Sequence, residues 1–161
     1  MDYRKLIKGK KLSVTLKKDP VKGVGLYTRE KILKGDIIAF YKIKVFLLKD
    51  YETDGVYSFE VYKKNGDEYK RLIGDIYEES FPEPIDGIPF WAPFANEPNK
   101  GQRTNAMIDI DLKSNFEGRT YLSPGDIVIY KLVATKMIKP GSEILWYYGP
   151  DYPRNYSVSK K

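Results

Sequence analysis

The absence of both cysteine and histidine from all 161 residues restricts most strongly what this chain can fold into. No disulfide framework is available, and a structural zinc site would lack its usual ligands. Stability must therefore come from a hydrophobic core, which a chain of this length can bury. The same absence excludes a cysteine nucleophile, a histidine general base and a Ser-His-Asp triad. Any catalysis has to use tyrosine, lysine, carboxylates, backbone groups or a bound cofactor.

Short strand patterns dominate the sequence. Runs of alternating, β-branched or aromatic residues, bounded by turn residues, are typical of strands. The predicted strands are residues 12–16, 37–48, 56–62, 69–73, 104–110, 127–138 and 143–148. Between the third and the fourth of these, Asn65-Gly66 predicts a hairpin turn. No segment has a long helical period, so we predict one mainly β domain over residues 1–161 with few short helices.

The net charge of +6 is unevenly distributed. Residues 1–22 carry eight basic and two acidic side chains, a surplus of +6, whereas residues 50–87 carry four basic and eleven acidic ones, which gives −7. Each stretch is either a solvated surface or an interaction surface. As an interaction surface, the basic stretch would bind nucleic acid and the acidic stretch would bind a basic peptide. No apolar run approaches the roughly 20 residues of a membrane span, and no signal peptide is evident. We expect an intracellular protein with no membrane segment.

Four motifs in a fixed order carry a resemblance to a known family. A Gly-x-Gly alone indicates only a tight turn, so their order and spacing carry the specificity. The motifs are Lys22-Gly23-Val24-Gly25-Leu26 between two predicted strands, Ile32-Leu33-Lys34-Gly35-Asp36 with Tyr41 after it, Phe94-Ala95-Asn96-Glu97-Pro98-Asn99 followed by Asn105-Ala106, and Ala134 to Leu145 running into Trp146-Tyr147-Tyr148-Gly149. Over residues 12–152 the chain resembles the SET-domain protein lysine methyltransferases. Its ending is similar to their motif A-x-R/K-x-I-x-x-G-E-E-L-x-x-x-Y-G.

The chain departs from the family pattern at defined positions. Glu97 stands where the family motif Asn-His-Ser-Cys-x-Pro-Asn has histidine, and Asn105 best matches its second asparagine. Tyr147 stands where an aspartate often precedes the last tyrosine. No cysteine-rich flank is present, so the chain resembles compact viral members of the family. By this resemblance the parts are an N-terminal SET part (12–49), a variable insert (50–93), a C-terminal SET part (94–152) and a tail (153–161).

The resemblance implies a fold of small sheets with a pseudoknot-like crossing near the C-terminus. It also implies methyl transfer from S-adenosylmethionine to lysine, without a metal. Tyr148 would be the catalytic tyrosine. The implied cofactor-binding residues are Lys22, Gly23, Val24, Gly25, Asn96, Glu97, Asn105 and Tyr152, and the implied substrate-binding residues are Tyr41, Tyr147 and Tyr152.

The implied partner is a basic protein or peptide, a histone tail first, which places the protein in the nucleus rather than the cytoplasm. Direct nucleic-acid binding is expected to be weak or absent, and a homodimer stays open. Two other functions remain as alternatives. The chain could be a SET-like module that binds peptides without catalysis, because Glu97 departs from the motif. It could also be a small β-barrel that binds nucleic acid through its basic N-terminus and tyrosines, although the acidic insert would repel phosphates.

Overall fold

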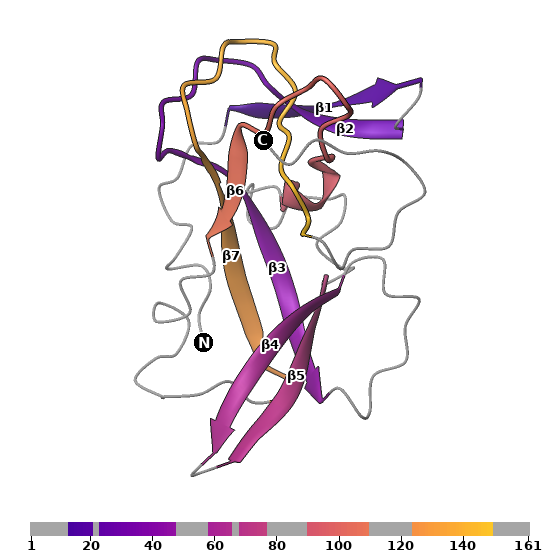
Figure 1. Cartoon of the computed structure of the whole chain (residues 1–161), viewed down its shortest axis with the longest axis vertical. Coiled ribbons are helices and arrows are strands. Elements are labelled where there is room, and N and C mark those ends of the chain that lie inside the picture. The colour runs from indigo at the N-terminus through magenta and orange to yellow at the C-terminus, as the bar shows by residue number, and fades with distance from the viewer. Residues whose placement is uncertain are drawn as a thin grey trace. The chain divides into compact units, whose positions relative to one another are not determined.

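The computed structural model describes residues 13–20, 23–47, 58–65, 68–76, 90–109 and 124–149. In these ranges the regular structure is almost entirely β-strand, with very little helix (Figure 1). The mainly β prediction is therefore confirmed. The chain divides into two compact units, and each is described by itself. The first unit contains Met1–Lys10, Tyr41–Phe90 and Ile110–Tyr130, and the second contains Lys11–Phe40, Trp91–Asp109 and Lys131–Lys161. Within the described ranges, no helix has the length and apolar character needed to span a membrane.

The second unit is built on two antiparallel strand pairs. Strand β1 (Val14–Asp19) pairs with β2 (Gly23–Thr28). Strand β6 (Ala106–Asp109) pairs with the end of β7 (Ile127–Ala134). The short 3-10 helix η3 (Ala92–Phe94) precedes the central motif. The large buried apolar side chains of this unit include Val14, Leu26, Ile32, Ile38, Phe40, Leu132, Ile138, Ile144, Leu145 and Trp146.

The first unit contains the hairpin of β4 (Ser58–Asn65) and β5 (Glu68–Ile76). The register pairs Asn65 with Glu68, as the Asn-Gly turn predicts. Strand β5 also pairs with the second half of β3 (Ile37–Leu47). In hydrogen-bonded order the larger sheet runs β4-β5-β3-β7-β6.

Tyr130 in β7 belongs to the core of the first unit. It is 2% exposed, and burial raises the pKa of its hydroxyl to about 12. Desolvation opposes formation of the phenolate, so this group stays neutral over the physiological pH range. Tyr130 is therefore one of the many tyrosines of this chain whose role is packing.

The predicted strand over residues 143–148 is wrong. The segment makes two isolated bridges instead, one antiparallel from Glu143 to Tyr27 and one parallel from Leu145 to Asn96. It cannot extend either ladder, because its neighbours change from one residue to the next. The alternation of apolar residues reflects burial of Ile144, Leu145 and Trp146 in this irregular environment.

Candidate functional site

The segment after the turn at Pro140-Gly141 is bonded to two other parts of the second unit. The Leu145 N–H donates to Oδ1 of Asn105 at 2.9 Å, and Nδ2 of Asn105 donates to the Glu143 carbonyl at 2.9 Å. The Leu145 carbonyl accepts from the backbone of Asn105 at 3.0 Å, and the Trp146 N–H donates to the Asn96 carbonyl at 3.1 Å. Residues 96, 105 and 143–146 therefore meet at one place, which agrees with the crossing that the family resemblance implies.

Gly25 and Asn96 meet Glu143 beside this crossing. Nδ2 of Asn96 donates to Oε2 of Glu143 at 3.2 Å and to the Val24 carbonyl at 3.3 Å. A β-carbon on Gly25 would lie 3.0 Å from Oε2 of Glu143 and 3.2 Å from Nδ2 of Asn96. Gly25 is thus required by the close approach of strand β2 to this pair of polar side chains.

Gly23 is glycine for a different reason. Its φ of +82° lies in the left-handed region, and no atom lies within 4 Å of where its β-carbon would be. Both glycines are part of strand β2, so the pair is not the turn between strands that the isolated motif suggests. Val24 between them is 42% exposed, an unusual fraction for valine, so the backbone here faces open space.

Tyr148 is held at both ends by hydrogen bonds. Its hydroxyl donates to the Ala95 carbonyl, and its backbone N–H donates to Oε2 of Glu97 at 2.9 Å. Its ring also contacts that of Trp146, with centroids 4.9 Å apart and planes tilted by 60°. These contacts fix both the phenol oxygen and the backbone of Tyr148 relative to the central motif.

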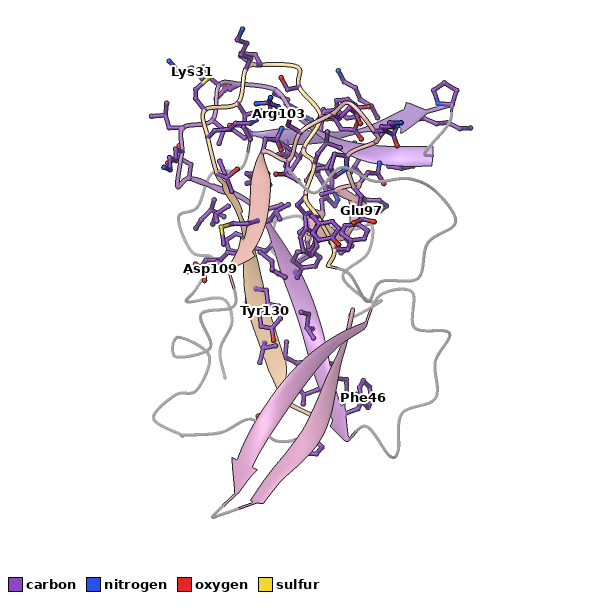
Figure 2. The ribbon with its side chains drawn as sticks, in the orientation of Figure 1. Lys31, Phe46, Glu97, Arg103, Asp109 and Tyr130 are labelled. Atoms are coloured by element: carbon purple, nitrogen blue, oxygen red, sulfur yellow. The ribbon has the colours of Figure 1, made fainter. Side chains whose placement is uncertain are left out.

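Glu97 is a buried carboxylate, with 4% of its surface exposed (labelled in Figure 2). Burying a carboxyl group is costly unless it is hydrogen-bonded, and the Tyr148 N–H supplies one such bond. The residue that departs most clearly from the family motif is therefore bonded directly to the predicted catalytic tyrosine.

The remaining predicted site residues are placed less completely. Tyr147 is half-buried in the same segment as Tyr148. Tyr41 belongs to the first unit and is 2% exposed, and its role in substrate binding stays a prediction. Lys22 and Tyr152 lie outside the described residues. The predicted site residues that the structure brings together are Val24, Gly25, Asn96, Glu97, Asn105 and Tyr148.

Two contributors to the site carry no role in the sequence prediction. Glu143 bonds to Asn96 and approaches Gly25. Its place in the motif Gly-Ser-Glu-Ile-Leu is the sequence signal by which it could have been identified. The Ala95 carbonyl accepts from Tyr148, but a backbone group leaves no signature in a sequence.

The chemistry available at this site is positional and electrostatic. The site presents a phenol hydroxyl, two side-chain amides, two carboxylates and backbone carbonyls. In the described part of the chain, no group of three or more acidic side chains could hold a metal ion. Such a set suits a reaction that needs an aligned donor and acceptor more than one that needs a strong base.

Comparison with solved structures finds the same fold in methyltransferases. No protein-family model and no curated protein matches the chain. A Plasmodium falciparum protein assigned as a histone methyltransferase is 18% identical, with a TM-score of 0.51, over 89% of this chain and 98% of the other. CpSET8 from Cryptosporidium is 21% identical, with a TM-score of 0.54, over 88% of this chain and 59% of the other.

ATXR5, solved in complex with histone H3.1 mono-methylated on an arginine, is 18% identical, with a TM-score of 0.53, over 91% of this chain and 60% of the other. The chain thus spans nearly all of the first neighbour and about three-fifths of the other two. At these identities the likeness concerns the fold. The chain therefore has the fold of the SET-domain histone methyltransferases.

Proposed function

We propose that this protein is an S-adenosylmethionine-dependent protein-lysine N-methyltransferase whose substrate is a basic protein, with a histone as the first candidate. The observation that carries the proposal is the fixing of Tyr148 by Ala95 and Glu97 beside the crossing of Asn96 and Asn105. Three segments far apart in the sequence, residues 24–25, 95–105 and 143–148, are thus brought to one place. The described residues supply no alternative set of catalytic groups at that place.

The residues around Gly25 fit the proposed cofactor. Bound S-adenosylmethionine would supply an electrophilic methyl group together with a cationic ammonium group. Both side-chain hydrogen bonds of Asn96 use Nδ2, which leaves Oδ1 as an acceptor for such an ammonium. The Glu143 carboxylate adds a complementary negative charge beside it. The open backbone at Gly23 and Val24 lets a ligand lie against strand β2.

Tyr148 would act on the reacting groups through its hydroxyl oxygen. The phenol O–H donates its hydrogen bond to the Ala95 carbonyl, so the oxygen lone pairs are directed to the opposite side. There they can orient the amino group of a substrate lysine and favour positive charge near the reacting atoms. The lysine must be neutral to react, and its proton would leave to solvent. Alignment of the two reactants then provides most of the acceleration.

The preference for a basic substrate is supported by charge. Residues 50–87 carry a net charge of −7, which would attract a lysine- and arginine-rich segment. A histone substrate would place the enzyme in the nucleus, and the histone complex of the structural neighbour ATXR5 makes histones the first substrates to test.

Transfer of labelled methyl groups from S-adenosylmethionine to purified core histones tests the proposal. We expect label on at least one histone, with mass spectrometry locating it on a lysine. Binding of the cofactor without label on histones or on other basic proteins would favour a non-catalytic peptide-binding module, the alternative that the Glu97 substitution motivates. Failure to bind the cofactor would overturn the proposal.

The two glycines of β2 should respond differently to alanine. In Gly25→Ala the new methyl group would lie 3.0 Å from Oε2 of Glu143 and would push this carboxylate away from Asn96. We therefore expect S-adenosylmethionine to bind about tenfold more weakly or worse, equivalent to about 1.4 kcal/mol. Gly23→Ala meets no neighbour but strains the backbone at positive φ, by about 1–2 kcal/mol. Calorimetric titration of the cofactor and thermal unfolding separate the two effects. Unchanged cofactor affinity in Gly25→Ala would remove Asn96 and Glu143 from the proposed cofactor site.

Glu97 is expected to position Tyr148. Glu97→Leu leaves the part-buried Tyr148 N–H without this acceptor, whereas Glu97→Gln keeps an oxygen that can accept the same bond. We expect kcat to fall about tenfold or more in the leucine variant, with the affinity for S-adenosylmethionine changing much less. The glutamine variant should retain most of the wild-type kcat. Equal loss in both variants would show that the negative charge matters and not the position of Tyr148.

A further inference from the structure

Two segments of the second unit are paired into a ribbon that carries many exposed side chains. The segments are residues 28–36 and 134–142. Backbone hydrogen bonds of 2.8 to 3.0 Å join them at three levels. The bonded partners are Thr28 with Gly141 and Ser142, Ile32 with Ile138, and Ala134 with Gly35 and Asp36. The side chains on this ribbon are therefore held at fixed separations.

The ribbon buries one pair of side chains and exposes the neighbouring pairs. Ile32 and Ile138 are 6% and 2% exposed and face the core. Lys31 and Leu33 flank Ile32 in the sequence, and Lys139 and Met137 flank Ile138. Both lysines are exposed, and so are Leu33 and Met137, at 53% and 47%.

The exposed cations of the two segments are together called the basic ridge. It comprises Arg29, Lys31, Lys34, Lys136 and Lys139, all of them exposed (Lys31 is labelled in Figure 2). The two acids of the same segments are already engaged: Glu30 accepts from Ser13 Oγ at 3.1 Å, and Asp36 accepts from the Leu33 N–H at 3.2 Å. The five cations less the two acids leave a net charge of +3.

The exposed lysines are concentrated on two bonded segments. Lys31 and Lys139 each adjoin the bonded pair Ile32 and Ile138, so the backbones that carry them run side by side. An anionic partner would be attracted by both cations. The proposed substrate cannot be this partner, because a basic peptide would be repelled by the same cations.

We infer that the basic ridge binds the phosphate backbone of a nucleic acid, independently of its base sequence. A row of phosphates supplies several negative charges to several fixed cations at once, and releases counterions on binding. The two apolar side chains Leu33 and Met137 are too few for a protein interface, which buries about 800 Å² on each partner. This inference goes beyond the proposed methyl transfer and does not depend on it.

The test is binding of a fluorescently labelled DNA duplex of about 20 base pairs and mixed sequence, at salt concentrations between about 50 and 200 mM. We expect the wild-type chain to bind, with an affinity that falls as salt rises. Lys31→Glu/Lys139→Glu should weaken binding about tenfold or more. It should also flatten the slope of log affinity against log salt by about 2, because each lost phosphate contact lowers this slope by about 0.9 and the variant loses two lysines.

The control variant Lys18→Glu/Lys100→Glu makes the same change of net charge at exposed positions outside the ridge. It should weaken binding much less. Equal losses in the two variants would mean that only net charge matters and would overturn the inference, as would absence of DNA binding by the wild type. A second pair, Lys34→Glu/Lys136→Glu, should reproduce the ridge effect if the first pair unfolds the chain.

The serine variant Leu33→Ser/Met137→Ser tests whether the exposed apolar side chains of the ribbon contribute to binding. It retains all five cations, so we expect its DNA binding to equal that of the wild type. Loss of DNA binding in this variant, with the lysine variants unaffected, would assign the surface to an apolar contact instead and would contradict the inference.

Discussion

Replacing Tyr148 by phenylalanine is expected to reduce methyl transfer to histones about a hundredfold while leaving S-adenosylmethionine bound. Removing one positioned polar group from a catalytic site typically lowers kcat by about 10²–10³. The substitution deletes the hydroxyl that bonds to the Ala95 carbonyl and keeps the ring that contacts Trp146. The backbone bond to Glu97 is also preserved, so the phenylalanine ring should occupy the same place.

The measurement is the initial rate of label transfer at saturating cofactor and histone, with cofactor affinity determined separately by calorimetry. Tyr130→Phe is the matched control, because it removes a tyrosine hydroxyl that is buried in the first unit and not in the proposed site. It should transfer methyl groups at close to the wild-type rate. A Tyr148→Phe enzyme as active as the wild type would exclude the hydroxyl from the reaction and would shift attention to the backbone carbonyls.

Much of the fold could be predicted from the sequence, because local patterns determine most of its strands. The long β-branched and aromatic run beginning at Ile37 forms β3, which ends one residue earlier than predicted. The Asn-Gly pair at 65–66 identified the hairpin whose register places Asn65 across from Glu68. In both cases, hydrophobic alternation or turn chemistry acts over a few neighbouring residues.

The site was harder to predict where its geometry depends on distant segments. Residues 143–148 alternate like a strand, but their hydrogen bonds go in turn to Asn105, Asn96 and Glu97, and no periodicity encodes such a change of partner. The resemblance identified Tyr148 as a candidate site residue. It could not show that Glu97, in place of histidine, bonds to the Tyr148 backbone, because that contact joins residues 51 positions apart.

Removing the Asn105 side chain is expected to lower the free energy of unfolding more than any other substitution proposed for this chain. Its amide group satisfies two backbone groups of the crossing at 2.9 Å each, and Asn105 itself is 9% exposed. Asn105→Ala would leave the Glu143 carbonyl and the Leu145 N–H without these partners, at about 1–3 kcal/mol for each unsatisfied buried group. We therefore expect the free energy of unfolding to fall by about 2–4 kcal/mol, a large part of the stability of a small domain.

Urea unfolding measures this loss as a shift of the midpoint at constant slope. Asn99→Ala is the control, because Asn99 is exposed and its hydrogen bonds to Gln102 use only the Asn99 backbone, so its cost should stay within about 0.5 kcal/mol. Asn105→Asp distinguishes the two bonds, since it retains an acceptor for Leu145 but sets an oxygen against the Glu143 carbonyl.

If Asn105→Ala is as stable as Asn99→Ala, the backbone bonds to the Leu145 carbonyl suffice to hold the crossing. A marked loss would make Asn105 the residue that fixes Tyr148 in place, because the segment it holds at Glu143 and Leu145 continues directly to that tyrosine.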